Sequence, residues 1–257
     1  MAIETLEPYQ VAPTERLASI LPGNPPETGT KAFRGLSASG KTYWIKVPNN
    51  PQGSRVLATE QIVTAVGGLI DAPVRETALI EISSDWDGWP ITDGFSLRKC
   101  VAHASLELSG SEESRDQAYI RNDDNARRWA RWIALWDWCF GSDEQWLYEH
   151  EADKSMWSFD HNMWFLDSGN WGAEQCNGGT TGEWLWRGEW KGIDSDEILR
   201  VADLISKIAR SQIQAACYSI PAEWGVPLND LDALTEMLLQ RRVGVADRLR
   251  VNVGRAR

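Results

Sequence analysis

Two aspartates near the middle of the chain are the first candidates for chemistry. Asp143 stands in the segment GSDEQWLYEHEADKSMWSFDHN, in a loop that Gly141 opens directly after a tryptophan-rich helical pattern. A carboxylate there, ahead of a predicted β-hairpin, is well placed to accept the proton of a hydroxyl group. Asp160 follows 17 residues later, after the bulky run MWSF, where a carboxylate leaving a strand is well placed to bind a hard cation. This layout is typical of a phosphoryl-transfer site, although two acids at such a spacing also occur by chance.

A lysine and a glutamate in the first quarter of the chain could complete such a site. In the predicted strand KTYWIKV, alternation places Trp44 and Lys46 on the same face. Glu60 lies 14 residues after Lys46, in a predicted helix. A helix glutamate that pairs with a strand lysine orients that lysine toward nucleotide phosphates. The alternative is a solvated edge lysine and an ordinary surface glutamate.

The segment GLSASGK joins the two predicted strands of an opening hairpin and contains Gly35 and Gly40. A glycine-containing hairpin can place backbone N–H groups over phosphates, so both glycines are candidate nucleotide-binding residues. Because every hairpin needs a turn, the alternative is a turn that contacts no ligand.

The three histidines do not follow a zinc-binding pattern. The chain has no CxxC pair and no HxxxH, which argues against zinc at His150 and His161. His103, in the segment VAHASLEL, is expected to be a structural strand residue near the junction of two lobes.

Strand signals dominate the first hundred residues, and helix signals dominate the rest. AFRGL and KTYWIKV predict a hairpin, residues 54–70 predict a helix, and RETALIEIS and GFSLRKCVAHASLEL predict further strands. After the polar stretch SGSEESRD, the sequence predicts a helix over DDNARRWARWIALWDWCF, a strand in SMWSFDHNMWFLD, an irregular loop CNGGTTGEWLWRGEWKG and two closing helices. The order predicts an α+β protein with a strand-rich N-lobe and a mainly helical C-lobe, which change over near residues 105–115.

The net charge and composition of the chain limit the functional classes of protein to which it can belong. A net charge of −11 argues against nucleic-acid binding, because an acidic surface repels phosphate backbones. The four scattered cysteines predict free thiols in a reducing compartment. No signal sequence or long apolar run is present, which predicts a soluble cytoplasmic protein. The 15 tryptophans fit either an aromatic core or a carbohydrate-binding platform, and a platform requires Trp184, Trp186 and Trp190 exposed in a row.

Several segments together resemble the HipA-like kinase family, in particular its small single-domain bacterial branch. They are AFRGLSASGKTYWIKVPNNPQGSRVLATEQIV, DAPVRETALIEI, AHASLEL, WDWCFGSDEQWLY, SFDHNMWF and IPAEWGVP with LLQRR, in the family's order from Phe33 to Arg242. The resemblance implies a two-lobed protein-kinase-like fold, with an N-lobe over residues 1–107 and a C-lobe over residues 108–257, that binds ATP and Mg²⁺ in between.

The resemblance also implies a role for each candidate residue. Lys46 would contact the nucleotide phosphates and Glu60 would hold the lysine, while VAHASLEL would enter the hinge that meets adenine. Asp143 would be the catalytic carboxylate and Asp160 the magnesium ligand. The implied function is transfer of the γ-phosphoryl group of ATP to a Ser or Thr hydroxyl, most simply that of a protein. Some relatives pair with an antitoxin, so a regulatory protein partner is a further candidate.

The chain departs from the family pattern at the second metal position. Relatives often carry Asp-Arg and then an Asn that holds a second metal, whereas here Asp143 is followed by Glu-Gln-Trp. Gln145 or Asn162 could substitute, because each has an amide oxygen. Asn162 also stands where relatives often have Gly. The departure keeps an alternative open, a nucleotide-binding pseudokinase that acts as a regulatory or interaction module.

Overall fold

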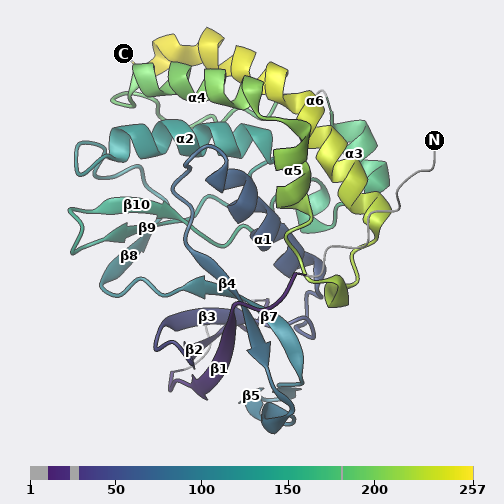
Figure 1. Ribbon diagram of the computed structural model, residues 1–257. Helices are drawn as coiled ribbons and strands as arrows, with labels where there is room; N and C mark the ends of the chain where they lie inside the picture. The colour runs from purple at the N-terminus through teal and green to yellow at the C-terminus, as the bar shows by residue number, and fades with distance from the viewer. Residues whose placement is uncertain (1–10, 24–28, 181, 257) are drawn as a thin grey trace.

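The computed structural model describes residues 11–23, 29–180 and 182–256. It has a strand-rich N-terminal part and a helical C-terminal part (Figure 1). In the view of Figure 1, the barrel strands lie at the bottom, helices α2, α4 and α6 lie at the top, and α1 lies between them. The lobe boundary predicted at residues 107 and 108 falls in the connection between strands β7 and β8, and it stays a prediction.

Five strands of the N-terminal part form a closed barrel in the order β1-β2-β3-β7-β4. They are β1 (Glu15–Ile20), β2 (Phe33–Ser37), β3 (Thr42–Lys46), β4 (Thr77–Ile82) and β7 (Cys100–Leu106). Antiparallel pairing of Phe33 with Ile45 confirms the predicted hairpin, and parallel pairing of β1 with β4 closes the barrel. Between β4 and β7 the chain makes a short excursion through η1 (Ser84–Trp86), β5 (Pro90–Thr92) and β6 (Phe95–Ser96).

Helix α1 (Arg55–Gly68) confirms the helix predicted over residues 54–70. Its apolar side chains are buried between the barrel and the helical part. Polar contacts also join it to the helical part, because Arg55 pairs with Asp230 at 2.9 Å and the Trp171 indole N–H donates to Thr59 Oγ1 at 2.9 Å. These contacts fix the helix that carries the candidate glutamate.

The C-terminal part contains a three-stranded antiparallel sheet and a set of packed helices. The sheet has the order β10-β9-β8, formed by β8 (Ser111–Ser114), β9 (Trp146–Glu149) and β10 (Ser155–Ser158). The helical elements are α2 (Asn125–Trp138), η2 (Asp167–Gly169), α3 (Ala173–Gly179), α4 (Ser195–Lys207), α5 (Arg210–Cys217), η3 (Ala222–Trp224), α6 (Leu228–Asn252) and η4 (Val253–Ala256).

Two segments of the C-terminal part differ from their predictions. SGSEESRD was expected to be a polar connection, but its residues 111–114 form strand β8 against β9. A strand at the edge of a sheet can be polar because its backbone pairs on one side and its side chains face solvent. The first residues of CNGGTTGEWLWRGEWKG were expected in a loop, but they complete helix α3.

Tryptophan rings form the centre of the C-terminal core. The ring of Trp129 lies 4.7 Å from that of Trp146 and 5.3 Å from that of Trp186, measured between centroids. Trp186 is 4% exposed and Trp190 is 1% exposed, whereas Trp184 is 44% exposed. The requirement of a carbohydrate platform for three exposed indoles in a row is therefore not met.

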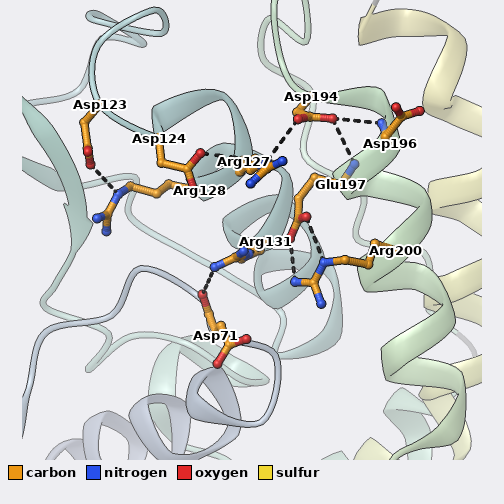
Figure 2. Close-up of polar contacts among 10 residues, drawn as sticks. All are labelled: Asp71, Asp123, Asp124, Arg127, Arg128, Arg131, Asp194, Asp196, Glu197 and Arg200. Atoms are coloured by element: carbon orange, nitrogen blue, oxygen red, sulfur yellow. Dashed lines mark hydrogen bonds and ion pairs between the residues drawn. The ribbon is translucent and has the colours of Figure 1, made fainter.

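A network of ion pairs joins α2 to α4 on the surface of the C-terminal part (Figure 2). Glu197 accepts from Arg131 and Arg200, each at 2.6 Å. Asp194 pairs with Arg127 at 3.3 Å and also accepts backbone N–H groups of the first turn of α4. The network stabilises the packing of these helices and lies outside the candidate site.

The four cysteines are free thiols, as the sequence predicted. Three of them, Cys139, Cys176 and Cys217, are buried. Within the described ranges, no helix has the length and apolar character needed to cross a membrane.

Candidate functional site

A cavity of about 480 Å³ lies between the barrel and the three-stranded sheet of the C-terminal part. The barrel side contributes Trp44 and Lys46 of β3, as strand alternation predicted for these two residues. The other wall contributes Gln145, Leu147 and Asp160. Residues that also line the cavity are Thr30, Ala32, Glu60, Arg75, Ser105, Leu106, Glu107, Leu108, Ser111, Glu113 and Phe159. The cavity thus combines apolar side chains, among them Trp44 and Leu147, with six charged ones: Lys46, Glu60, Arg75, Glu107, Glu113 and Asp160.

Three of the four candidate residues meet at the inner end of this cavity. Lys46 Nζ donates to a carboxylate oxygen of Glu60 and to Asp160 Oδ1, the latter at 2.7 Å. The Lys46 and Glu60 side chains are 10% and 3% exposed, and that of Asp160 is 23% exposed. One ammonium group therefore joins a helix carboxylate from α1 to a carboxylate that follows β10.

Burial and the mutual charges shift the pKa values of this cluster. Burial alone would lower the pKa of Lys46, but the carboxylates of Glu60 and Asp160 raise it above its ordinary value. Burial would raise the pKa of Glu60, but Lys46 and His103 lower it. For Asp160 burial dominates and raises the pKa, although Lys46 opposes the shift. Lys46 and Glu60 are thus held as an ion pair, whereas the Asp160 carboxylate is the group that additional positive charge would stabilise most.

His103 is a fourth member of the cluster that the sequence did not identify. It lies directly opposite Lys46 in the pairing of β3 with β7. Its ring is fully buried, with Nε2 3.1 Å from Glu60 Oε2 and Nδ1 3.3 Å from Gln61 Oε1. The expectation of a structural strand residue is incomplete, because His103 holds the glutamate that holds the lysine. The signal available in the sequence was the strand register, which places Lys46 and His103 side by side.

Asp143 does not line the cavity. Its carboxylate accepts from Arg115 Nη2 at 3.0 Å and from the side-chain amide of Gln145, and its side chain is 39% exposed. The next residue but one, Gln145, does line the cavity. Asp143 therefore lies beside the cavity and not in it, bonded to Gln145, which stands two residues later and lines the cavity.

Backbone geometry and two tryptophans fix the loop that carries Asp143. Asp143 has a positive φ of 54°, in the left-handed region. A Cβ at Gly141 would clash with the indole ring of Trp136, which accounts for the glycine. The Trp184 indole N–H donates to the Gly141 carbonyl at 2.6 Å, and the Trp186 indole N–H donates to Glu144 Oε1 at 2.9 Å. The two tryptophans thus bind the loop on both sides of Asp143.

Gly35 and Gly40 lie away from the cavity, so the prediction that they contact phosphates does not fit the structure. Gly35 belongs to β2 and faces the barrel interior, where a Cβ would come 2.5 Å from Ile45 Cδ1. Gly40 is exposed in the turn between β2 and β3. Lys46 ends β3 at the opposite end from this turn. Antiparallel strands instead bring the connection before β2 to the lysine, and Thr30 and Ala32 of that connection line the cavity.

The two candidate amide ligands occupy different places. Gln145 lines the cavity, and its amide nitrogen is used by Asp143, which leaves its amide oxygen for a cation. Asn162 is 9% exposed and is not among the described residues that line the cavity. A Cβ at Gly169 would clash with the Asn162 backbone carbonyl, so a turn packs against this position. Gln145 is therefore the better placed of the two.

The remaining two histidines contact other side chains of the chain. His161 is buried, shares a hydrogen bond with Ser158 Oγ at 2.8 Å and packs edge-on against Trp164. Burial lowers the pKa of His161 to about 4, so its ring is neutral at neutral pH. His150 lies on the surface and pairs with Glu112 at 3.2 Å. In the part of the chain that the structure describes, no group of three or more His, Cys, Asp or Glu side chains is arranged to hold a metal.

Arg75 also lines the cavity that contains Lys46 and Asp160, and the sequence did not identify it as a site residue. Its guanidinium group donates to the Leu106 carbonyl at 3.1 Å and lies 5.0 Å from the Trp157 ring centroid. Burial lowers the pKa of Arg75, and the side chain is 8% exposed. It holds the strand end at which the barrel connects to the rest of the chain. No sequence motif identifies Arg75, because its role depends on contacts with segments far from it in the chain.

Comparison with known proteins supports the fold. No protein-family model and no curated protein matches the sequence. Among solved structures, the fold is similar to that of a Helicobacter pylori proinflammatory kinase, CtkA, with a TM-score of 0.60. The sequences are 10% identical over an alignment that covers 91% of this chain and 96% of the kinase. The chain therefore shares a kinase-like fold over nearly its whole length.

Proposed function

We propose that this protein is an ATP-dependent phosphotransferase of the HipA-like kinase type, which transfers the γ-phosphoryl group to a Ser or Thr hydroxyl of a protein. The observation that carries the proposal is the convergence of Lys46, Glu60 and Asp160 in one cavity of a kinase-like fold. A cytoplasmic location and a regulatory protein partner of the antitoxin type remain predictions from the sequence.

The lining of the cavity favours one orientation of the bound nucleotide. Its apolar walls, among them Trp44 and Leu147, suit the flat face of a purine base. Its charged end suits the triphosphate, because the Lys46 ammonium can contact phosphate oxygens while Glu60 keeps it in place. The base would therefore lie toward the Leu106–Leu108 connection and the phosphates toward Asp160.

Asp160 and Gln145 fit a magnesium ion. Mg²⁺ keeps several waters and takes much of its coordination from substrate phosphates, so one or two protein oxygens are enough. The side chains of Asp160 and Gln145 line the same cavity, and burial raises the pKa of Asp160 although Lys46 opposes the shift, so a cation would stabilise its charged form. The positive charge of a bound cation would neutralise the charge that develops on the transferred group.

The transfer needs a group that takes the hydroxyl proton, and Asp143 is the proposed base. The acceptor oxygen forms a bond to the γ-phosphorus, the bond from this phosphorus to the β–γ bridging oxygen breaks, and ADP leaves with that electron pair. The hydroxyl proton passes to the Asp143 carboxylate. Positioning and charge stabilisation supply most of the rate in such a reaction.

The contacts of Asp143 support a second candidate function, a nucleotide-binding pseudokinase. Arg115 and Gln145 both donate hydrogen bonds to the Asp143 carboxylate, and Asp143 is not among the described residues that line the cavity. If this arrangement persists with ATP bound, the protein would bind nucleotide without transferring phosphate and would act through a partner.

One experiment separates the two functions. The purified protein is incubated with γ-labelled ATP, Mg²⁺ and a cell extract, and label on the protein or on extract proteins is measured. Label is expected with the wild type and with Glu151→Ala, a matched change of an exposed carboxylate in the turn between β9 and β10. Loss of the general base in Asp143→Ala is expected to lower the transfer rate by about a hundredfold or more. Equal blanks for wild type and Asp143→Ala, with nucleotide binding intact, would establish the pseudokinase.

A further inference from the structure

The turn η3, in the segment IPAEWGVP, joins helices α5 and α6 and lies against the barrel. This segment contributes to the resemblance to the HipA-like kinases, but none of its residues has a role in the function proposed above. Trp224 of η3 is 2% exposed and belongs to the apolar core that also contains the buried face of α1, whereas Glu223 is exposed. The contacts of η3 join the C-terminal part to the barrel at a place separate from the Leu106–Leu108 connection.

Strand β7 extends beyond its partner β3 at the end where η3 lies. β7 pairs with β4 along its whole length, but its pairing with β3 begins only at His103. In the stretch before His103, the Val101 N–H donates to the Glu223 carboxylate, and the Trp224 indole N–H donates to the Val101 carbonyl at 2.8 Å. Two side chains of η3 therefore bind the backbone of β7 on the side that β3 leaves open.

The same turn contacts the start of α1. The Ser54 hydroxyl, at the N-cap position of α1, donates to the Trp224 carbonyl at 2.7 Å. The adjacent Arg55 pairs with Asp230, in the first turn of α6, at 2.9 Å. Trp224 thus binds a barrel strand through its indole and the start of α1 through its backbone carbonyl.

Helix α1 and strand β7 are the two elements that position Glu60. The glutamate belongs to α1, and His103 of β7 contacts it, with Nε2 3.1 Å from Glu60 Oε2. Val101 and His103 are two residues apart in β7, so their side chains point to the same face of the strand. η3 therefore fixes α1 and β7 to each other two residues from the contact that supports Glu60.

We propose that η3 is a clamp that positions Glu60 for nucleotide binding, with Glu223 and Trp224 as its positioning residues. By joining α1 to β7, the clamp keeps the Glu60 carboxylate where it bonds Lys46 Nζ. The proposal rests on the proposed function, because the oriented ammonium group is needed to bind nucleotide phosphates. Without the clamp, α1 and β7 move independently, Lys46 is oriented for part of the time only, and the affinity for MgATP falls in proportion.

Substitution of Glu223 tests the clamp, because this side chain is exposed and its loss leaves the core packed. Binding of a nonhydrolysable ATP analogue with Mg²⁺ is measured by calorimetry, well below the melting temperature. Glu223→Ala removes the acceptor of the Val101 N–H and is expected to weaken binding about fivefold. Glu223→Gln keeps an acceptor oxygen and is expected to stay within about twofold of the wild type. Glu81→Ala makes the matched change at an exposed glutamate of β4, opposite Val101, and is also expected to stay within about twofold.

A double variant distinguishes positioning of Glu60 from a general effect on the fold. In a Glu60→Gln background, Glu223→Ala is expected to weaken nucleotide binding by less than about a further twofold, because the carboxylate that the clamp positions is already gone. In urea unfolding without nucleotide, the two changes together are expected to cost less unfolding free energy than the sum of the single changes.

The outcomes separate failure of this proposal from failure of the proposed function. Unchanged affinity in Glu223→Ala, an equal loss in Glu223→Gln or in Glu81→Ala, or additive effects of Glu223→Ala and Glu60→Gln would overturn the clamp even if the protein is a kinase. Absence of binding of the ATP analogue to the wild type would refute the nucleotide function. In that case the unfolding measurement alone decides the clamp, since non-additive free energies support the positioning of Glu60 by η3 and additive ones overturn it.

Discussion

The Lys46–Glu60–Asp160 cluster and the Asp143 loop lie on neighbouring parts of the site but are held in different ways. Lys46 and Glu60 are buried and bonded to each other, and His103 supports the glutamate from the opposite strand. Asp143 is partly exposed, has a left-handed backbone, and pairs with the exposed Arg115. The first region is a set of charges that satisfy one another, whereas the second has partners that an acceptor could displace.

The difference indicates which half of the reaction is prearranged. The cluster presents an oriented ammonium group and the Asp160 carboxylate in one cavity before any ligand binds, so nucleotide binding requires little rearrangement. Asp143 must exchange Arg115 or Gln145 for a hydroxyl. Because an exposed ion pair contributes roughly 0–1 kcal/mol, this exchange costs little. Variants in the two regions should therefore affect binding and transfer separately.

The largest effect is expected from Asp160→Asn. The change keeps the shape of the side chain but removes the charge that binds the cation, so Mg²⁺-dependent nucleotide binding should be lost. With MgATP at about a hundredfold excess over its Kd, the wild-type melting temperature should rise by about 5–10 °C. The variant should show no rise, in thermal unfolding followed with and without MgATP.

Asp143→Asn is the matched control for this comparison, since it removes a carboxylate from the loop instead of the cluster. It should keep the MgATP-induced rise. A rise that survives in Asp160→Asn, or disappears in Asp143→Asn, would reverse the roles assigned to the two regions.

The sequence predicted much of the cluster but little of its surroundings. Alternation in β3 placed Trp44 with Lys46, and apolar spacing defined the helix of Glu60, because local periodicity decides both. The contacts of Asp143 with Arg115 and of Glu60 with His103 join segments far apart in the chain, and no local pattern encodes them. The glycine turn between β2 and β3 lies at the end of β3 opposite Lys46, and the connection before β2 lines the cavity instead, a placement that depends on how separate segments pack.

The second largest effect is expected from Lys46→Ala. It leaves the buried Glu60 carboxylate with His103 as its remaining partner, and an uncompensated buried charge costs about 3 kcal/mol of unfolding free energy. Nucleotide affinity should also fall, because a phosphate contact is lost. Urea unfolding and calorimetric titration with MgATP measure the two effects.

Lys41→Ala serves as the control for Lys46→Ala. Lys41 also pairs with a glutamate, Glu76, at 2.7 Å, but both side chains are about half exposed. Its loss should change the unfolding free energy much less than the loss of Lys46 does, because solvent screens an exposed pair. Equal stabilities of the two variants would show that Lys46 is a surface residue in solution.

A smaller effect is expected from His103→Gln, which weakens the support of Glu60 from β7. We expect a loss of about 1.5 kcal/mol of unfolding free energy, typical for a hydrogen bond to a charged group. A residue that acts through Glu60 should also couple to Lys46, so the double variant with Lys46→Ala should deviate from additivity by at least about 0.5 kcal/mol. His150→Gln, at the surface pair with Glu112, should be additive with Lys46→Ala. Additivity of both histidine variants would reduce His103 to a packing residue.

The smallest effect is expected from Glu197→Gln. The pKa of the Glu197 carboxylate is lowered, whereas the pKa of Asp160 is raised. Burial opposes ionisation of Glu197, but hydrogen bonds from Arg200 and Arg131 lower its pKa below the ordinary 4.5. Its stabilising contribution should be complete above that pH and decline as the pH falls through the lowered pKa in the folded protein. Wild type should therefore exceed the variant by about 1 kcal/mol at pH 7, with the difference shrinking below about pH 4. Urea unfolding at both pH values measures it, and a difference that stays constant would mean that Glu197 contributes shape and not charge.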